Sequence, residues 1–244
     1  YMIGAYMAFS LSALTGNLFV AIVIGIVLSV ALGAGLEWAL FSRLYKRDHL
    51  QQVLLTFALI LVFNEAQQSI WGNYPKSIPT PSYLSSSISL TPELGYSVYR
   101  IALMAICVAL ALVMMFVIQK TRVGRLIRAA ESNPEMVEAL GFDSRILFRM
   151  VFAAGAALAA AAGILAAPVE SAYPGIGERV LIISFVVVVI GGIGSIRGAF
   201  LGSLLIGLAD AFGKVFVPKF SSVLIYALMA LVLVLRPSGL FGRP

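Results

Sequence analysis

The run Val180-Leu-Ile-Ile-Ser-Phe-Val-Val-Val-Val-Ile190 indicates the fold of this chain, because only one of its eleven residues is polar. Other long apolar runs occur along the chain, separated by short polar stretches. Backbone amides inside a bilayer must be hydrogen-bonded within their own helix or within a closed barrel. The strands of a barrel would alternate apolar and polar residues, which this run does not. The sequence therefore predicts membrane-spanning α-helices.

The overall composition agrees with a membrane location. Hydrophobic residues make up 61% of the 244 residues, whereas charged residues make up only 11%. A soluble domain typically carries roughly 25% charged residues, so this chain has too few to cover a water-soluble surface. The single cysteine, Cys107, excludes an intrachain disulfide, and its apolar neighbours predict a thiol packed in the interior.

Apolar segments of about 20 residues can cross the hydrocarbon layer as helices, so we expect an all-α, polytopic transmembrane bundle of about eight segments. Tyr1–Thr15 is too short to cross, and we expect it to be the end of a helix that starts before Tyr1. The segments on either side of Arg197 are joined so closely that they are either two spans or one broken, re-entrant helix. The expected segments are residues 1–15, 17–41, 50–71, 98–119, 147–167, 180–196, 198–217 and 221–236.

Lysine and arginine residues predict which loops lie in the cytoplasm. If the segments cross alternately, twelve of the 17 basic residues fall on the same side as the C-terminus, which is therefore expected to be cytoplasmic. The longest cytoplasmic segment covers about 120–146. The external segment, about 72–97, is rich in proline and is expected to be an extended, irregular loop. This topology accounts for the surplus of basic residues, and without a soluble basic face a nucleic-acid partner is not expected.

A short helix is predicted over residues 134–140 of the cytoplasmic segment. Asn133 suits the N-cap, Pro134 the first helical position and Gly141 the residue that ends the helix. Such a helix is too short to be stable alone in water. Two interpretations remain open: a solvated connector that anchors the helix ends, or a docking helix for a cytoplasmic partner. Its apolar edge is formed by Met136, Val137 and Leu140.

Three motifs in the chain resemble one family. They are Gly124-Arg-Leu-Ile-Arg-Ala-Ala with Asn133-Pro-Glu-Met and Ala139-Leu-Gly141, then Ile190-Gly-Gly-Ile-Gly-Ser-Ile-Arg-Gly-Ala-Phe-Leu-Gly202, and finally Arg236-Pro-Ser-Gly-Leu-Phe-Gly242. In this order they resemble LivH-type permeases of the branched-chain amino acid family of ABC importers, which have a type II-like membrane fold. The chain departs from the pattern at Arg197, where many relatives would carry proline.

The resemblance implies a single transmembrane permease domain, 1–244, in the cytoplasmic (inner) membrane of a bacterium or archaeon. It implies a second homologous permease subunit, two cytoplasmic ATPase subunits and an extracytoplasmic substrate-binding protein as partners. No Gly-x-x-x-x-Gly-Lys-Ser/Thr loop occurs in the chain, so ATP and Mg are expected at the partner ATPases, with no cofactor on this chain. The residues expected to couple to the ATPases are Arg128, Glu131, Asn133, Pro134, Glu135, Met136, Glu138, Leu140 and Gly141.

Polar and glycine residues within the apolar segments predict a translocation pathway. Asn64 and Gln68 lie four residues apart and so share a helix face. Glu65 or Asp210 is expected to pair with a cation such as Lys214. The glycine-rich turn is interpreted either as close helix packing or as an unwound part of the pathway. The predicted pathway residues are Asn64, Gln68, Gly191, Gly192, Gly194, Ser195 and Asp210.

The remaining polar residues do not suggest chemistry. His49 is the only histidine and is assigned to a solvated loop, so neither a metal site nor a Cys–His pair is predicted. Glu37 is expected to reach the inner membrane interface. The leading hypothesis is an importer subunit for branched-chain or other hydrophobic amino acids, with urea, amides or aromatic acids next. The alternative is a self-sufficient secondary transporter or channel.

Overall fold

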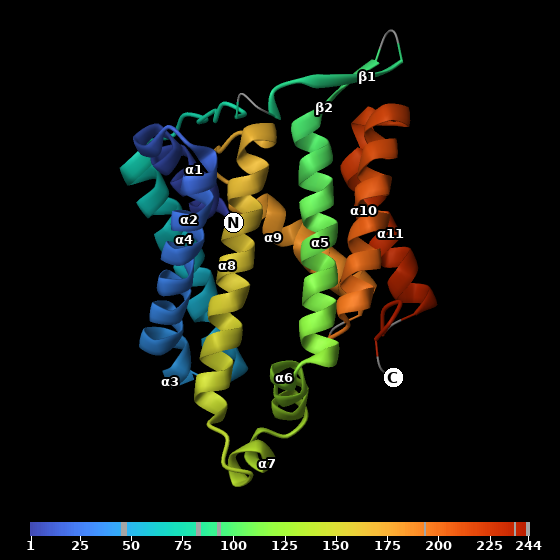
Figure 1. Cartoon of the computed structure of the whole chain (residues 1–244). Coiled ribbons are helices and arrows are strands. Elements are labelled where there is room, and N and C mark those ends of the chain that lie inside the picture. The colour runs from blue at the N-terminus through green and yellow to red at the C-terminus, as the bar shows by residue number, and fades with distance from the viewer. Residues whose placement is uncertain (45–47, 82–83, 92–93, 193, 237, 243–244) are drawn as a thin grey trace. The chain divides into compact units, whose positions relative to one another are not determined.

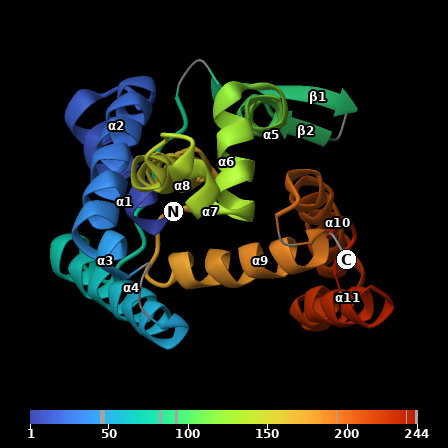
Figure 2. The same cartoon turned by 90° about the horizontal axis from the view of Figure 1, so that it is seen from below.

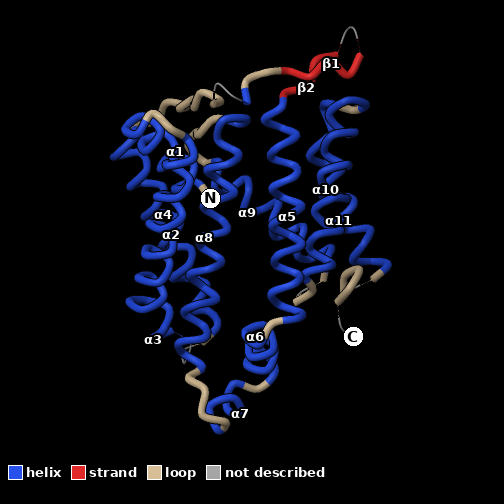
Figure 3. Tube along the Cα trace, viewed as in Figure 1, coloured by secondary structure: helices blue, strands red, loops and turns tan. Residues whose placement is uncertain are grey.

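The computed structural model describes residues 1–44, 48–81, 84–91, 94–192, 194–236 and 238–242. Helices account for nearly all of its regular structure (Figure 3). The chain divides into two compact units, which are described one after the other. The first contains Tyr1–Val108 and Arg122–Gly177, and the second contains Ala109–Thr121 and Glu178–Pro244.

The first unit is built mainly from long apolar helices (Figure 1). The helix α2 continues beyond its last regular α turn: it passes through a π turn, η1, into the short helix α3. The helices are α1 (Met2–Thr15), α2 (Leu18–Leu36), η1 (Glu37–Phe41), α3 (Ser42–Leu44), α4 (His49–Trp71), the first half of α5 (Val98–Lys120), α6 (Arg122–Ser132), α7 (Pro134–Ala139) and α8 (Ser144–Glu170).

Small residues bring α1, α2 and α8 together, and the three helices lie side by side (Figure 2). The buried face of α2 repeats every four residues, at Ala21, Gly25, Ser29 and Gly33. A Cβ atom added at Gly33 would lie 2.6 Å from the Cβ atom of Ala156 on α8. Small residues at this spacing allow two membrane helices to approach closely, so van der Waals contact holds this core together.

The external segment is more regular than expected. Its second half forms an antiparallel hairpin of β1 (Ser87–Thr91) and β2 (Leu94–Ser97), in which Ile88 is opposite Tyr96. Its first half is held by an isolated backbone bridge between Lys76 and Ala172, with N···O distances of 2.7 and 2.9 Å. The prediction of an irregular loop was therefore wrong for the hairpin, because three of the four prolines in 72–97 lie in its first half.

The second unit contains the second half of α5 together with the C-terminal helices. Buried side chains of α9, α10 and α11 form its core: Val186, Ile190, Ile206 and Ile225. In Figure 2, α9 is seen from the side, whereas α10 is seen closer to end-on, so the two helices cross steeply. The helices of this unit are α9 (Ile176–Gly191), α10 (Ile196–Phe216), the 3-10 turn η3 (Pro218–Phe220) and α11 (Ser221–Leu235).

Five helices among the described residues are long and apolar enough to cross a membrane. They cover Leu18–Leu44, Leu50–Trp71, Val98–Lys120, Ser144–Glu170 and Ile196–Phe216. The other three expected segments correspond to α1, α9 and α11, which have 14, 16 and 15 residues. At 1.5 Å per residue, each is shorter than the roughly 30 Å of the hydrocarbon layer.

The expectations about Cys107 and His49 were wrong. Cys107 is exposed on α5 rather than packed in the interior, because an apolar sequence context does not distinguish a lipid-facing position from a buried one. His49 belongs to the first turn of α4 rather than to a loop, and its side chain lies outside the described part of the structure.

Candidate functional site

The short helix α7 forms where the sequence predicts it. Asn133 is its N-cap, and the side-chain oxygen accepts a hydrogen bond from the backbone N–H of Met136 at 3.0 Å. Pro134 occupies the first turn, where its missing N–H has no helical partner to lose. Glu135 lies in the same turn, where the helix dipole favours negative charge.

Gly141 ends the helix as expected, although the helix stops at Ala139, one residue earlier than predicted. Gly141 has a φ of +87° and donates its N–H to the carbonyl oxygen of Glu138 at 2.9 Å. The N–H of Phe142 donates to the carbonyl oxygen of Val137 at 3.2 Å. These two bonds form a Schellman motif, which satisfies the last carbonyl groups and turns the chain away from the helix axis.

The apolar side chains of α7 lie on two faces of the helix, one buried and one exposed. Val137 is buried and packs with Ala130 of α6 and Leu147 of α8. Met136 and Leu140, in contrast, have exposed fractions of 58% and 70%. We call these two residues the docking face, because an exposed apolar patch can mark a site of interaction with a protein partner.

All of the predicted coupling residues are exposed, although one of them also makes a side-chain contact within the chain. The carboxylate of Glu138 accepts a hydrogen bond from the hydroxyl of Ser144, at the start of α8. Glu138 therefore ties α7 to α8 within the chain. Glu138 is exposed nonetheless, like the other charged residues of the set, Arg128, Glu131 and Glu135.

The glycine-rich stretch forms a tight turn between two helices. Helix α9 ends at Gly191, Gly192 and Gly194 have φ values of +94° and +81°, and Ser195 caps α10 by accepting the N–H of Gly198 at 3.0 Å. Residues 180–217 thus contain two helices rather than one continuous helix, so Gly194 does not share a helix face with Gly198. A Cβ atom at Gly198 would overlap the carbonyl group of Gly191, so the two backbones are in direct contact.

The C-terminal motif packs against this turn. The N–H of Leu240 donates to the carbonyl oxygen of Ile190 at 2.8 Å, and the N–H of Phe241 donates to that of Gly191 at 3.1 Å. A Cβ atom at Gly239 would lie 2.6 Å from the backbone of Gly192. Two motifs that are about 45 residues apart in the sequence therefore form one structural unit around the turn.

The polar residues of α4 differ in exposure. Gln67, which was not predicted, is buried and donates its side-chain N–H to the carbonyl oxygen of Gly72 at 2.9 Å. Asn64 is half-buried, whereas Glu65 and Gln68 are exposed. Each residue turns a helix by 100°, so Gln67 lies on a different face of α4 from Gln68. The buried face therefore carries Gln67, which is not one of the predicted pair Asn64 and Gln68.

Asp210 pairs with Lys214 as predicted. The Nζ atom of Lys214 lies 2.5 Å from the Oδ2 atom of Asp210, one turn apart on α10. Both side chains are partly exposed. This arrangement is a short-range helix pair of the kind that contributes only a few tenths of a kcal/mol in water, about 0.3–0.5 kcal/mol.

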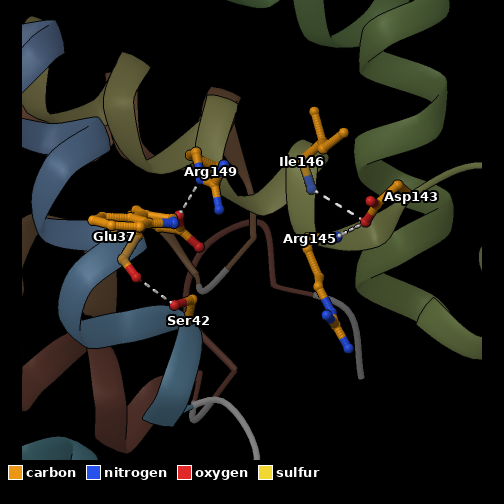
Figure 4. Close-up of polar contacts among 7 residues, drawn as sticks. Glu37, Ser42, Asp143, Arg145, Ile146 and Arg149 are labelled. Atoms are coloured by element: carbon orange, nitrogen blue, oxygen red, sulfur yellow. Dashed lines mark hydrogen bonds and ion pairs between the residues drawn. The ribbon is translucent and has the colours of Figure 1, made fainter.

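Sequence reasoning missed the most deeply buried charged side chain among the described residues. Glu37, expected at the membrane interface, is fully buried, and its Oε2 atom accepts a hydrogen bond from Nε of Arg149 at 2.7 Å (Figure 4). The error came from treating Glu37 alone. The repeat Ala21, Gly25, Ser29 and Gly33 continues to position 37, and this spacing places Glu37 on the face that α8 covers.

A cavity of about 450 Å³ lies between the turn from α1 to α2 and the first half of the external segment. Its wall is fixed by the bridge between Lys76 and Ala172. The Nζ atom of Lys76 lies 5.5 Å from the centre of the Phe9 ring, which lines the cavity. Hydroxyl groups in the lining come from Ser12, Ser77 and Thr80. No group of three histidine, cysteine or acidic side chains able to hold a metal ion occurs among the described residues.

The five membrane-length helices in the described part of the chain define the class, a multi-pass membrane protein. The chain belongs to the family of permease components of the branched-chain amino acid transport system, whose model matches residues 1–233. It is therefore a permease subunit of an ABC system and not an ATPase.

Curated relatives match over nearly the full chain. The high-affinity branched-chain amino acid transport system permease protein BraD of Pseudomonas aeruginosa is 32% identical, covering 100% of this chain and 84% of BraD. The corresponding protein LivH of Escherichia coli is 28% identical, covering 100% of this chain and 83% of LivH. A probable LivH of Methanocaldococcus jannaschii is 25% identical, covering 99% and 80%. No solved structure matches the chain.

Proposed function

We propose that this chain forms the translocation pathway for branched-chain or other hydrophobic amino acids in an ATP-driven importer. The names of BraD and LivH, which match the full chain, support this substrate class. The importer would lie in the cytoplasmic membrane of a bacterium or archaeon, with the C-terminus in the cytoplasm. Both compact units would belong to one permease domain with a type II-like arrangement of about eight membrane segments, in which α1, α9 and α11 complete the five long helices.

The proposed partners follow from membership in an ABC transport system. A second, homologous permease would complete the pathway, and a substrate-binding protein would deliver the amino acid from outside. Two ATPase subunits would bind ATP and Mg on the cytoplasmic side. The cavity beside the external segment offers hydroxyl groups and a fixed wall for contact on the outer side.

The observation that carries the proposal is the docking face of α7. The helix is capped at both ends, so its position is defined even though it has only six residues. Val137 anchors it to α6 and α8, which leaves Met136 and Leu140 exposed. Exposed apolar anchors on a rigid element are typical of the centre of a protein interface.

The proposed pathway residues remain those predicted from the sequence, but their burial now makes some of them better candidates than others. Asn64 and Asp210 are at least partly buried, whereas Gln68 is exposed. The buried Gln67 joins the set. Gly191, Gly192, Gly194 and Ser195 would act by bringing α9 and α10 together, which fixes the shape of the pathway.

The test is to produce the chain together with its ATPase subunits and replace Met136 and Leu140 by serine. We expect binding of the ATPases to weaken by roughly tenfold or more, because the apolar anchors are lost while the helix caps remain. Affinity purification measures binding, and leucine uptake into proteoliposomes measures transport.

The matched control is Val123→Ser, which changes an exposed apolar residue on the neighbouring helix α6. It should leave ATPase binding unchanged. If the ATPases bind the Met136→Ser, Leu140→Ser variant as tightly as the wild type, and hydrolysis remains coupled to uptake, the docking assignment is wrong. Uptake of leucine compared with urea and benzoate tests the substrate class separately.

A further inference from the structure

The buried pair of Glu37 and Arg149 has no role in the docking or pathway assignments above. Glu37 begins the π turn η1, and Arg149 lies in the second turn of α8 (Figure 4). The Glu37 side chain is fully buried, whereas the Arg149 side chain has an exposed fraction of 37%. Arg149 is thus the only one of the two residues that reaches solvent.

Stability alone is a poor explanation for this pair. Removing two charges from water is costly, and apolar residues of similar volume are often as stable or more stable in the same place. The surrounding contact between α2 and α8 is already formed by small residues and van der Waals packing. A charged pair in such a contact instead defines one relative position of the two helices.

A continuous set of contacts leads from the docking helix to this pair. Glu138 of α7 accepts a hydrogen bond from Ser144 at the start of α8. Asp143 caps the same helix end by accepting the N–H groups of Arg145 and Ile146 at 2.9 and 3.4 Å (Figure 4). Because α8 is one uninterrupted helix from Ser144, a movement of α7 shifts Arg149 with it.

The carboxylate of Glu37 could accept a second hydrogen bond. In the π turn, the N–H of Ser42 bonds to the carbonyl oxygen of Glu37 across five residues, a geometry often found at functional positions. Among the described residues, the Oε1 atom of Glu37 accepts no hydrogen bond. Arg149 can therefore change from one bond to a bidentate pair, which is the favoured geometry of arginine with a carboxylate.

We propose that Glu37 and Arg149 are positioning residues, which transmit the displacement of α7 by the ATPases to the transmembrane helix α2. This inference rests on the proposed importer function. The ion pair, with one carboxylate oxygen not yet bonded, supplies the two arrangements that such transmission requires, and it connects the π turn to α8. Removing the pair should therefore uncouple ATP hydrolysis from transport while leaving the ATPases bound.

The experiment uses the reconstituted importer and the double variant Glu37→Met, Arg149→Met, which removes both charges and leaves neither unpaired. We expect ATPase binding and thermal stability close to wild type, with leucine transported per ATP reduced by about tenfold, within the range usual for coupled sites. Arg149→Lys keeps the charge but cannot form the bidentate pair, and should reduce transport per ATP by a smaller factor. The matched control, Arg145→Gln, removes an exposed arginine from the same helix and should behave as wild type.

Wild-type transport per ATP in the folded double variant would overturn the proposal, because the pair would then serve packing only. If the double variant does not insert, Arg149→Lys decides: unchanged transport per ATP at unchanged thermal stability overturns the proposal as well. Failure of the importer assignment is recognised differently, since the wild-type complex would then show no ATP-dependent leucine uptake at all. Hydrogen exchange of the full chain in nanodiscs adds an independent measurement, with faster exchange of residues 134–150 expected in the double variant.

Discussion

Two helix contacts in this protein use small residues for different purposes. Along α2, small residues recur every four positions and face α8, where Gly25 lies against Ile164 and Gly33 against Ala156. Between α9 and α10, the glycines are concentrated at one turn, where the backbones of Gly191 and Gly198 touch. The first contact ends in a charged pair, and the second is closed by the C-terminal segment.

In the α2–α8 contact, glycine determines how closely the two helices approach. In the α9–α10 contact, it determines how the backbone turns from one helix into the next. A long contact made of side chains and Cβ atoms can adjust by small shifts at many positions. A backbone contact at a turn with left-handed residues has no side chain that can move away. We therefore expect the two contacts to respond differently to the addition of one methyl group.

The largest effect is expected for Gly198→Ala. The new Cβ atom would overlap the carbonyl group of Gly191, and neither backbone can move without opening the turn. We expect a loss of about 3 kcal/mol or more in unfolding free energy, measured as a lower apparent Tm of the purified chain in detergent. Gly207→Ala on the same helix is the control, because nothing lies within 4 Å of its added Cβ atom. Similar Tm values for the two variants would show that the α9–α10 contact adjusts as easily as the α2–α8 contact.

The second effect tests the charged end of the α2–α8 contact. Glu37→Gln leaves Arg149 without its carboxylate, which typically costs about 3–5 kcal/mol for a fully buried pair. Because Arg149 is partly exposed, we expect a smaller loss, about 2 kcal/mol, and a correspondingly lower Tm. Glu170→Gln, at the exposed end of α8, should leave the Tm unchanged. Equal stability of Glu37→Gln and wild type would mean that the small residues alone hold this contact.

The smallest effects are expected within the small-residue repeat. At Gly33, an added Cβ atom would meet the Cβ atom of Ala156 at 2.6 Å and the Cα atom of Ala153 at 3.3 Å, which are held by α8. At Gly25, it would meet the terminal carbon of Ile164, which can change rotamer. We expect Gly33→Ala to cost about 1 kcal/mol, and Gly25→Ala to be nearly neutral, since alanine favours the helix by a similar amount. The reverse order of Tm values would contradict this view of the contact.

Local signals in the sequence were enough to locate α7 and most long helices. The caps of α7 depend on residues within eight positions, and the apolar runs define the five long helices without reference to neighbours. The pair Asp210 and Lys214 was also predictable, because it lies within one turn of one helix.

Properties that depend on other segments could not be predicted in the same way. Glu37 and Arg149 are 112 residues apart in the sequence, so the burial of Glu37 follows only once α8 covers α2. The exposure of Cys107 depends on which face of α5 other segments cover, and apolar composition is the same in both cases. The hairpin of β1 and β2 was missed because proline and serine signals dominated the external segment.

The π turn also places a constraint on chain length. A π turn holds one residue more than the α turn it replaces, so η1 is equivalent to a one-residue insertion in the second helix. If the same residues adopted α geometry throughout, every later residue of the helix would be rotated by about 100°. The ring of Phe41, now 4.7 Å from that of Phe152 between centres, would then leave α8. At this position the number of residues is therefore as important to the structure as their identity.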